Sequence, residues 1–241
     1  LFDFRYEAQL DLWQRFVSNG YVTRKHNTLL RDSLGMYPDL DRVFLYCFIR
    51  EMKPKKIVEV GSGESTVVVR RALVDGQQDP RHVVIEPYRA NAVPKEVELH
   101  QVEVQTMSFD VFDELQDGDL LFLDSSHVTM PYGDTLVELI TILPRLQTGV
   151  YVHIHDIFLP YDYPEGWSHK DRIYTEQWLL ALLLYGAEQE WEVIWGSKFM
   201  KEQHSDVLLS MPHYPLRPSQ KKPNGGSFFI RKLGKARRLE Q

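Results

Sequence analysis

The stretch Ile57–Thr66 reads IVEVGSGEST, and it decides the fold. Its apolar start, which carries Glu59, predicts a buried strand, and the two glycines separated by one residue predict a tight turn. Ser65 or Thr66 is expected to cap the helix that follows. Glycine accepts positive φ and lets a ligand approach the main chain closely. In an α/β sheet, such a turn at the end of the first strand is where nucleotide-like cofactors bind. The stretch is not a complete dinucleotide fingerprint, because Thr stands at position 66.

Length, charge and cysteine content narrow the possible classes of protein. The 241 residues suffice for one substantial α/β domain, and the net charge of −6 argues against general binding to nucleic acids or membrane surfaces. The basic tail Arg231–Arg238 is interpreted as a solvated terminus. The single cysteine, Cys47, excludes an internal disulfide and fits a reducing compartment. No apolar run approaches the roughly 18 residues of a membrane span, so we predict a cytoplasmic protein without one.

The pattern along the chain predicts one domain with a helical beginning. Residues 1–52 are expected to form a helical segment, a lid or cap of the same domain, with helices over 6–16 and 40–52. Residues 53–241 alternate strands and helices, which is typical of a parallel sheet. The predicted strands are 56–60, 82–86, 97–104, 120–124, 150–154, 190–195 and 227–232, and the predicted helices are 66–73, 109–115, 135–143 and 175–185. The last strand follows an irregular, proline-rich section without an evident helix, so we expect it to be antiparallel.

An acid stands at the end of the second predicted strand, in Val83–Pro87 (VVIEP). A carboxylate about 20 residues beyond a glycine turn can accept hydrogen bonds from both hydroxyls of a cofactor ribose. The alternative is an acid that favours a helix N-terminus. In combination with the glycine turn, we interpret Glu86 as a ribose-binding residue.

Two further strand ends carry carboxylates and imidazoles. Asp124 and His127 follow the fourth predicted strand, and His155 and Asp156 follow the fifth. Because the carboxyl ends of neighbouring parallel strands meet at one edge, we expect these four side chains to converge. Such a group can bind a divalent metal or act as a general base. His153 lies inside the strand, where a core histidine explains it equally well.

Five segments together resemble one protein family: VEVGSGEST (58–66), VVIEPY (83–88), DLLFLDSSHV (119–128), LPRLQTGVYVHIHDIFLPYDYP (143–164) and YTEQWLLALLL (174–184). They are similar to class I S-adenosylmethionine (SAM)-dependent methyltransferases that are often associated with glycosyltransferases. The resemblance implies the class I methyltransferase (Rossmann-like) fold, an α/β fold with a seven-stranded, mostly parallel sheet, helices on both faces and one antiparallel strand. It also implies SAM as methyl donor and a hydroxyl of a sugar in a glycan as acceptor. A fused or cooperating glycosyltransferase is the expected partner.

Site residues follow from this interpretation. The cofactor is expected to contact Glu59, Gly61, Ser62, Gly63, Ser65, Thr66, Glu86, Pro87 and Asp124. Catalysis is assigned to His155, Asp156 and Asp124. The acceptor is expected to meet His127, Tyr161, Tyr163, Trp167 and Glu176, since aromatic rings stack on the CH faces of sugars while carboxylates meet hydroxyls.

A metal is one of the alternatives that the sequence leaves open. Metal-dependent O-methyltransferases of the catechol and macrolide-sugar types carry an Asp after the fourth strand and an Asp-Asp or Asp-Asn pair after the fifth. Asp124, His155 and Asp156 are therefore candidate ligands for Mg²⁺ or Mn²⁺. Imidazole prefers softer metals, so His155 is alternatively a metal-free base. Two other functions remain: metal-assisted methylation of a phenolic or other small metabolite, and a non-catalytic SAM-fold module in a glycan-synthesis protein.

Overall fold

The computed structural model describes residues 2–31, 36–88, 93–170 and 172–237, and these build a seven-stranded sheet in the order β3-β2-β1-β4-β5-β7-β6. The strands are β1 (Lys56–Val60), β2 (Arg81–Ile85), β3 (Glu98–His100), β4 (Leu120–Leu123), β5 (Tyr151–Ile154), β6 (Trp191–Gly196) and β7 (Phe228–Lys232). Strands β1 to β5 pair in parallel, whereas β7 is antiparallel to both β5 and β6. This order with one reversed strand confirms the predicted class I methyltransferase fold.

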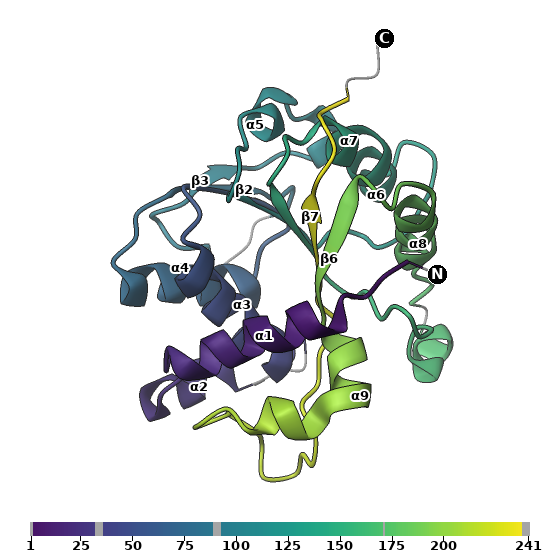
Figure 1. The fold of residues 1–241 in the computed structure, drawn as a ribbon. Coiled ribbons are helices and arrows are strands. Elements are labelled where there is room, and N and C mark those ends of the chain that lie inside the picture. The colour runs from purple at the N-terminus through teal and green to yellow at the C-terminus, as the bar shows by residue number, and fades with distance from the viewer. Residues whose placement is uncertain (1, 32–35, 89–92, 171, 238–241) are drawn as a thin grey trace.

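Helices cover both faces of the sheet, as predicted (Figure 1). The α-helices are α1 (Tyr6–Ser18), α2 (Asn27–Leu30), α3 (Asp39–Met52), α4 (Glu64–Gly76), α5 (Asp110–Asp113), α6 (Asp134–Leu136), α7 (Leu143–Arg145), α8 (Glu176–Gly186) and α9 (Ser197–Leu209). Short 3₁₀ turns lie at Arg24–His26, Val104–Thr106 and Glu165–Lys170, and a π-helical stretch, Val137–Ile142, joins α6 to α7. Among the residues described, none of the helices has the length and apolar content that crossing a bilayer requires.

The strands contribute to two separate hydrophobic clusters, one on each face. Ile57 and Phe122 pack with the core residues of α1, α3, α4 and α9, whereas Val58 and Leu121 pack with those of α5, α8 and the segment between α6 and α7. Neighbouring side chains along a strand point to opposite faces of the sheet. Because both faces are buried, these strands are mostly apolar rather than alternating between apolar and polar residues. Helices α1 and α3, from the predicted N-terminal segment, thus pack on the sheet itself; a lid role for that segment stays a prediction.

Three elements differ from the sequence-based prediction. Strand β3 is shorter than 97–104, because the chain turns into a 3₁₀ helix at Val104. Helix α9 lies in the section predicted to be irregular; its apolar pattern is weak and His204 interrupts it with φ −141° and ψ 36°. Helix α4 begins at Glu64 with Gly63 as its N-cap residue, so Ser65 and Thr66 lie in its first turn, where the Thr66 hydroxyl accepts the N–H of Gly63.

Candidate active site

The glycine turn joins the ends of three strands. The backbone N–H of Gly61 donates to the carbonyl of Ile85 (2.9 Å), and that of Asp124 donates to the carbonyl of Val60 (2.9 Å). Gly61 has φ +87°, and a Cβ at this position would lie 2.1 Å from the backbone oxygen of Asp124. Only glycine therefore allows the end of β1 to lie so close to the end of β4.

Two residues expected to contact the cofactor lie beneath this turn instead. Glu59 is completely buried, and its two carboxylate oxygens lie 2.7 Å from His82 Nε2 and 2.7 Å from the hydroxyl of Thr66. The Thr66 hydroxyl also accepts the N–H of Gly63 (3.2 Å). Neither Glu59 nor Thr66 lines a cavity. This corrects the prediction of direct contact: the two side chains shape the turn from below, and the partner on β2 could not be seen from a local motif.

A first cavity, of about 520 Å³, opens over the ends of β1, β2 and β4. Its walls include Gly61, Glu86, Pro87 and Asp124, four of the residues expected to contact the cofactor. The carboxylate of Glu86 accepts the N–H of Tyr88 (2.8 Å) and the hydroxyl of Ser62 (3.2 Å), which hold it at the mouth of the glycine turn. Tyr88, Gln105, Met130 and Tyr132 also line this cavity and were missed from the sequence.

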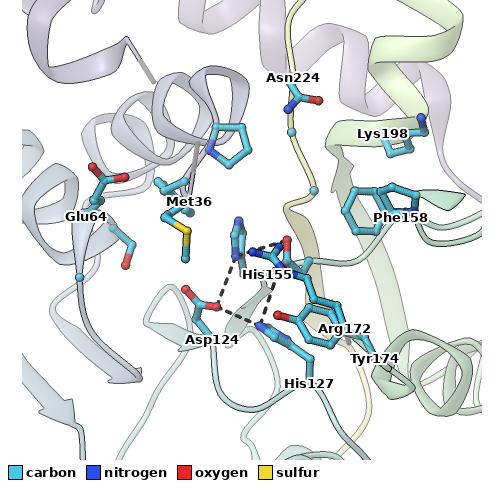
Figure 2. Close-up of a pocket in the computed structure, with 18 of the residues that line it drawn as sticks. Met36, Glu64, Asp124, His127, His155, Phe158, Arg172, Tyr174, Lys198 and Asn224 are labelled. Atoms are coloured by element: carbon cyan, nitrogen blue, oxygen red, sulfur yellow. Dashed lines mark hydrogen bonds and ion pairs between the residues drawn. The ribbon is translucent and has the colours of Figure 1, made fainter. Parts of the chain in front are cut away.

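A second, larger cavity of about 850 Å³ adjoins the first (Figure 2). It takes Ser62, Gly63 and Ser65 from the turn and the start of α4, so these predicted cofactor residues face it. The two cavities share Asp124 and Ser125, at the end of β4. A ligand in one cavity can therefore reach a ligand in the other beside Asp124.

The four residues at the ends of β4 and β5 converge, as predicted. Figure 2 shows three of them, Asp124, His127 and His155. His127 Nε2 and His155 Nδ1 each lie 3.3 Å from Asp124 Oδ1, and each lies 3.8 Å from the carboxylate of Asp156. The backbone N–H of His155 donates to the carbonyl of Leu123 (3.0 Å), which continues the pairing of the two strands into the site.

Further carboxylates hold the far side of each imidazole. His155 Nε2 lies 3.5 Å from Asp41 Oδ2, and His127 Nδ1 lies 2.9 Å from Glu176 Oε2. Burial alone would lower the pKa of both histidines, but the carboxylates outweigh it and raise each pKa well above the ordinary range. Burial would likewise raise the pKa of Asp124, yet the two imidazoles hold it well below its usual value. Both histidines are therefore cations at neutral pH, which argues against the free-base role predicted for His155.

The predicted metal site does not fit this geometry. A metal needs neutral imidazoles and carboxylates that point at one common position. Here the nitrogens of His127 and His155 themselves occupy the space between Asp124 and Asp156. Within the described residues, no group of three or more His, Cys, Asp or Glu side chains is arranged to hold a metal ion. We therefore derive no step through Mg²⁺ or Mn²⁺.

Asp156 differs from the other carboxylates of the site. Its side chain lines the larger cavity, is 16% exposed and accepts no hydrogen bond from any described residue. Burial raises its pKa, although both histidines oppose this shift. Asp156 and His127 also have positive φ (54° and 60°), a strained conformation for residues other than glycine that clusters at functional sites. Asp156 thus has both carboxylate oxygens free of hydrogen bonds from the described residues and, unlike Asp124, a raised pKa.

Only part of the predicted acceptor-binding set lines the cavity. His127 and Trp167 do so, together with Phe158 and Tyr174, which were not predicted. The hydroxyl of Tyr161 accepts Gln203 Nε2 (2.7 Å), and that of Tyr163 accepts the N–H of Gln177 (3.0 Å); neither ring is part of the wall. Glu176 is buried and holds His127. These three residues support the wall from behind, which corrects their predicted direct contacts.

Residues from distant parts of the chain complete the site and were missed from the sequence. Asp41 of α3 accepts the backbone N–H groups of Gly226 (2.8 Å) and Ser227 (3.0 Å). A Cβ on Gly225 would lie 2.5 Å from Asp41 Oδ1, so the Asn-Gly-Gly segment needs its glycine there. The Asn-Gly-Gly sequence alone predicts only a turn before the last strand. His153, in contrast, is a core histidine: it is buried against the hydroxyl of Ser227 (2.7 Å), and burial lowers its pKa to about 3.

We expect the free energy of unfolding to fall as pH rises above about 6.5, the ordinary histidine pKa. A histidine whose pKa is raised by folding stabilises the folded state fully at pH values below its unfolded-state pKa. This stabilisation is lost as the pH rises through the folded-state pKa of His127. The slope reaches about 1.4 kcal/mol per pH unit for each proton. Urea unfolding between pH 6.5 and 9 should show this slope, reduced in His127→Gln and unchanged in the exposed control His213→Asn. Equal slopes in all three proteins would contradict the buried cation.

Comparison with known proteins agrees with the fold. Residues 58–157 match the family model described as "Methyltransferase domain", whereas no curated protein matches the sequence. The SAH-bound methyltransferase PaMTH1 of Podospora anserina is 15% identical over 95% of this chain and 88% of its own, with a TM-score of 0.46. The structure cmcI-D160 Mg-SAM is 13% identical over 88% and 85%, with a TM-score of 0.44. The match of residues 58–157 to a methyltransferase domain supports an enzyme that transfers methyl groups, and the strand order is that of the class I methyltransferase fold.

Proposed function

We propose that the protein transfers a methyl group from SAM to a hydroxyl of a sugar in a glycan. The observation that carries this proposal is the meeting of two cavities at Asp124. The smaller cavity carries the ribose-type carboxylate Glu86, and the larger one carries Asp156 and the aromatic residues. A donor in the first cavity and an acceptor in the second would meet where a methyl group has to pass.

The cofactor would occupy the smaller cavity with its ribose, and its amino-acid end would extend past Asp124 toward the larger cavity. Glu86 would accept hydrogen bonds from the ribose hydroxyls, and Ser62, Gly63 and Ser65 would meet the amino-acid end. Asp124 stays ionised, because the imidazoles hold its pKa low, so it favours the sulfonium cation at the junction. SAM would thus lie along the ends of β2, β1 and β4.

The reaction then needs a group that removes a proton. As the acceptor oxygen attacks, an O–CH₃ bond forms and the S–CH₃ bond breaks, which leaves S-adenosylhomocysteine (SAH). The hydroxyl proton passes to the carboxylate of Asp156, whose oxygens are free of hydrogen bonds from the described residues and whose pKa is raised. His127 and His155 keep the neighbouring carboxylates in place, and much of the acceleration comes from alignment of oxygen, methyl carbon and sulfur.

The walls of the larger cavity suit a sugar. Trp167, Phe158 and Tyr174 present ring faces and edges, with centroid distances of 5.2 Å from Trp167 to each of the other two. Its volume of about 850 Å³ lies within the range of small-molecule sites. A glycosyltransferase as the partner that supplies the glycan follows from the sequence resemblance alone.

Binding and transfer can be measured separately. Calorimetry should show SAM and SAH binding to the unmodified chain. Methyl transfer from labelled SAM is then measured with glycosides and with a phenol such as catechol as acceptors. Each measurement is repeated after the protein has been treated with EDTA. Transfer to a glycoside supports the proposal, and transfer to the phenol alone contradicts the sugar acceptor. Loss of activity in EDTA, restored by Mg²⁺ or Mn²⁺, would contradict the metal-free mechanism. Absence of SAM and SAH binding would contradict the whole proposal.

We expect Glu86→Ala to weaken binding of both SAM and SAH by about 1–3 kcal/mol, because charge-assisted hydrogen bonds to the ribose are lost. Calorimetric titration of the variant measures the change. The matched control is Glu96→Ala, an exposed carboxylate that lines neither cavity. Equal affinity in Glu86→Ala and the unmodified protein would remove Glu86 from the cofactor site.

A further inference from the structure

Three basic side chains line the larger cavity, and the proposed methyl transfer does not use them. Lys198 and Lys201 belong to the first turns of α9, and Arg172 follows the 3₁₀ helix Glu165–Lys170 (Figure 2 labels Lys198 and Arg172). The chain as a whole carries a net charge of −6. Basic residues at this cavity are therefore a local feature rather than a reflection of overall composition.

Two of these cations lack a carboxylate partner. The ammonium of Lys201 donates to the side-chain oxygen of Asn224 (3.0 Å), and no carboxylate of the described residues lies within 4 Å of it. Burial lowers the pKa of Lys201, and the neighbouring Lys198 adds to this effect. The guanidinium of Arg172 lies 4.9 Å from the ring centroid of Trp167 and forms no ion pair with a described carboxylate. Lys198 alone is paired, with Glu202 (2.7 Å).

The carboxylates of the same cavity lie close to cations other than these three basic residues. Asp124 and Asp156 face the two histidines, and Glu64 forms an ion pair with Arg42 of α3. The cavity therefore presents positive charge that the described protein groups do not neutralise. A buried or half-buried cation without a counter-charge is stabilised when a ligand supplies one.

The position of the two lysines separates them from the cofactor. They follow β6, at the edge of the sheet beyond β5 and β7, whereas the cofactor cavity lies over β1, β2 and β4. None of the three basic residues lines the cofactor cavity. Ser62, Gly63 and Ser65, where the amino-acid end of the cofactor would lie, reach the larger cavity from the turn after β1 and the start of α4, whereas the lysines reach it from α9. The unmatched positive charge is therefore assigned to the second substrate and not to the carboxylate of the cofactor.

We propose that the acceptor carries an anionic group, a carboxylate, phosphate or sulfate, which Lys201 and Arg172 bind with the help of Lys198 while the reacting hydroxyl faces Asp156. This inference rests on the proposed function, because it places the acceptor in the larger cavity. An acidic sugar unit combines the two features that the cavity recognises: ring faces for Trp167 and a negative charge for the basic residues.

The test uses the full chain saturated with SAH. Inorganic phosphate, sodium D-glucuronate and D-glucose are titrated at constant ionic strength, and binding heat is measured. Saturable binding of D-glucuronate or phosphate, and much weaker binding of D-glucose, is expected. Lys201→Met and Arg172→Gln should each weaken anion binding by about tenfold, since each removes one charge-assisted contact. Lys55→Met, an exposed lysine outside this cavity, should not.

Three results would overturn the inference. The first is that D-glucuronate and D-glucose bind equally well while phosphate binds weakly. The second is that neither variant changes anion binding. The third is that the anions displace SAH instead of binding beside it. If SAH itself fails to bind, the proposed function fails; the same titrations of the cofactor-free chain then still decide whether Lys201 and Arg172 form an anion site.

Discussion

Replacement of Asp156 by Asn is expected to lower the rate of methyl transfer by about 10²–10⁴-fold while SAH affinity stays within a few-fold. The amide has nearly the same shape but cannot take a proton from the acceptor hydroxyl. Asp156 lines the acceptor cavity and is not among the residues that line the cofactor cavity, so cofactor binding should survive. Single-turnover transfer to a verified acceptor, together with calorimetry of SAH, measures the two effects independently.

His155→Gln distinguishes between the two possible bases. If Asp156 is the base, the histidine variant should lose less activity than Asp156→Asn, since it removes only a positioning cation. If His155 is the base, the order of the two effects reverses. Asp162→Asn, an exposed acid outside the cavity, serves as the control. Normal turnover in both site variants would refute catalysis at this end of β5.

The second large effect is expected for Gly61→Ala. The new methyl group would lie 2.1 Å from the backbone oxygen of Asp124, in a residue with φ +87°. Such a contact forces β1 and β4 apart at their carboxyl ends, so we expect a loss of about 2–4 kcal/mol in the free energy of unfolding. SAH affinity should fall as well, because Gly61 lines the cofactor cavity.

Urea unfolding with and without SAH measures both losses. The matched control is Gly186→Ala at the end of α8, where a Cβ would meet no atom within 4 Å and φ is not in the left-handed region. This control should keep the stability of the unmodified chain or gain slightly. Unfolding of Gly61→Ala at the same urea concentration as the control would show that the turn tolerates a side chain.

The sheet was largely predictable from the sequence, because its determinants are local. Strand β1 matches the predicted span, since five apolar-patterned residues end at a glycine turn. The meeting of Asp124, His127, His155 and Asp156 also followed from the pattern, because the ends of β4 and β5 are neighbours in a parallel sheet. Helix α9 was missed because it is not strongly amphipathic and breaks at His204.

The chemistry of the site was less predictable, because it depends on partners far apart in the chain. Glu59 belongs to a motif that suggests cofactor contact, but His82 on β2 holds it beneath the turn. His155 follows a strand end that suggests a base, but Asp41 and Asp124 hold it as a cation. Whether a carboxylate or an imidazole keeps a proton depends on all the groups that surround it in the folded protein. The spacing of residues along the sequence does not show which groups these are.

The hydrogen bonds from Gly226 and Ser227 to Asp41 connect an early helix to the last strand of the described chain. During synthesis, α3 and the strands β1 to β5 leave the ribosome long before this segment does. The wall that includes Asn224, Gly225 and Gly226 therefore cannot close until the final strand has been made. A product terminated before Asn224 would hold the glycine turn and the four strand-end residues, yet it would lack this wall of the acceptor cavity. Methyl transfer would thus require a chain that extends through the segment from Asn224 to Ser227.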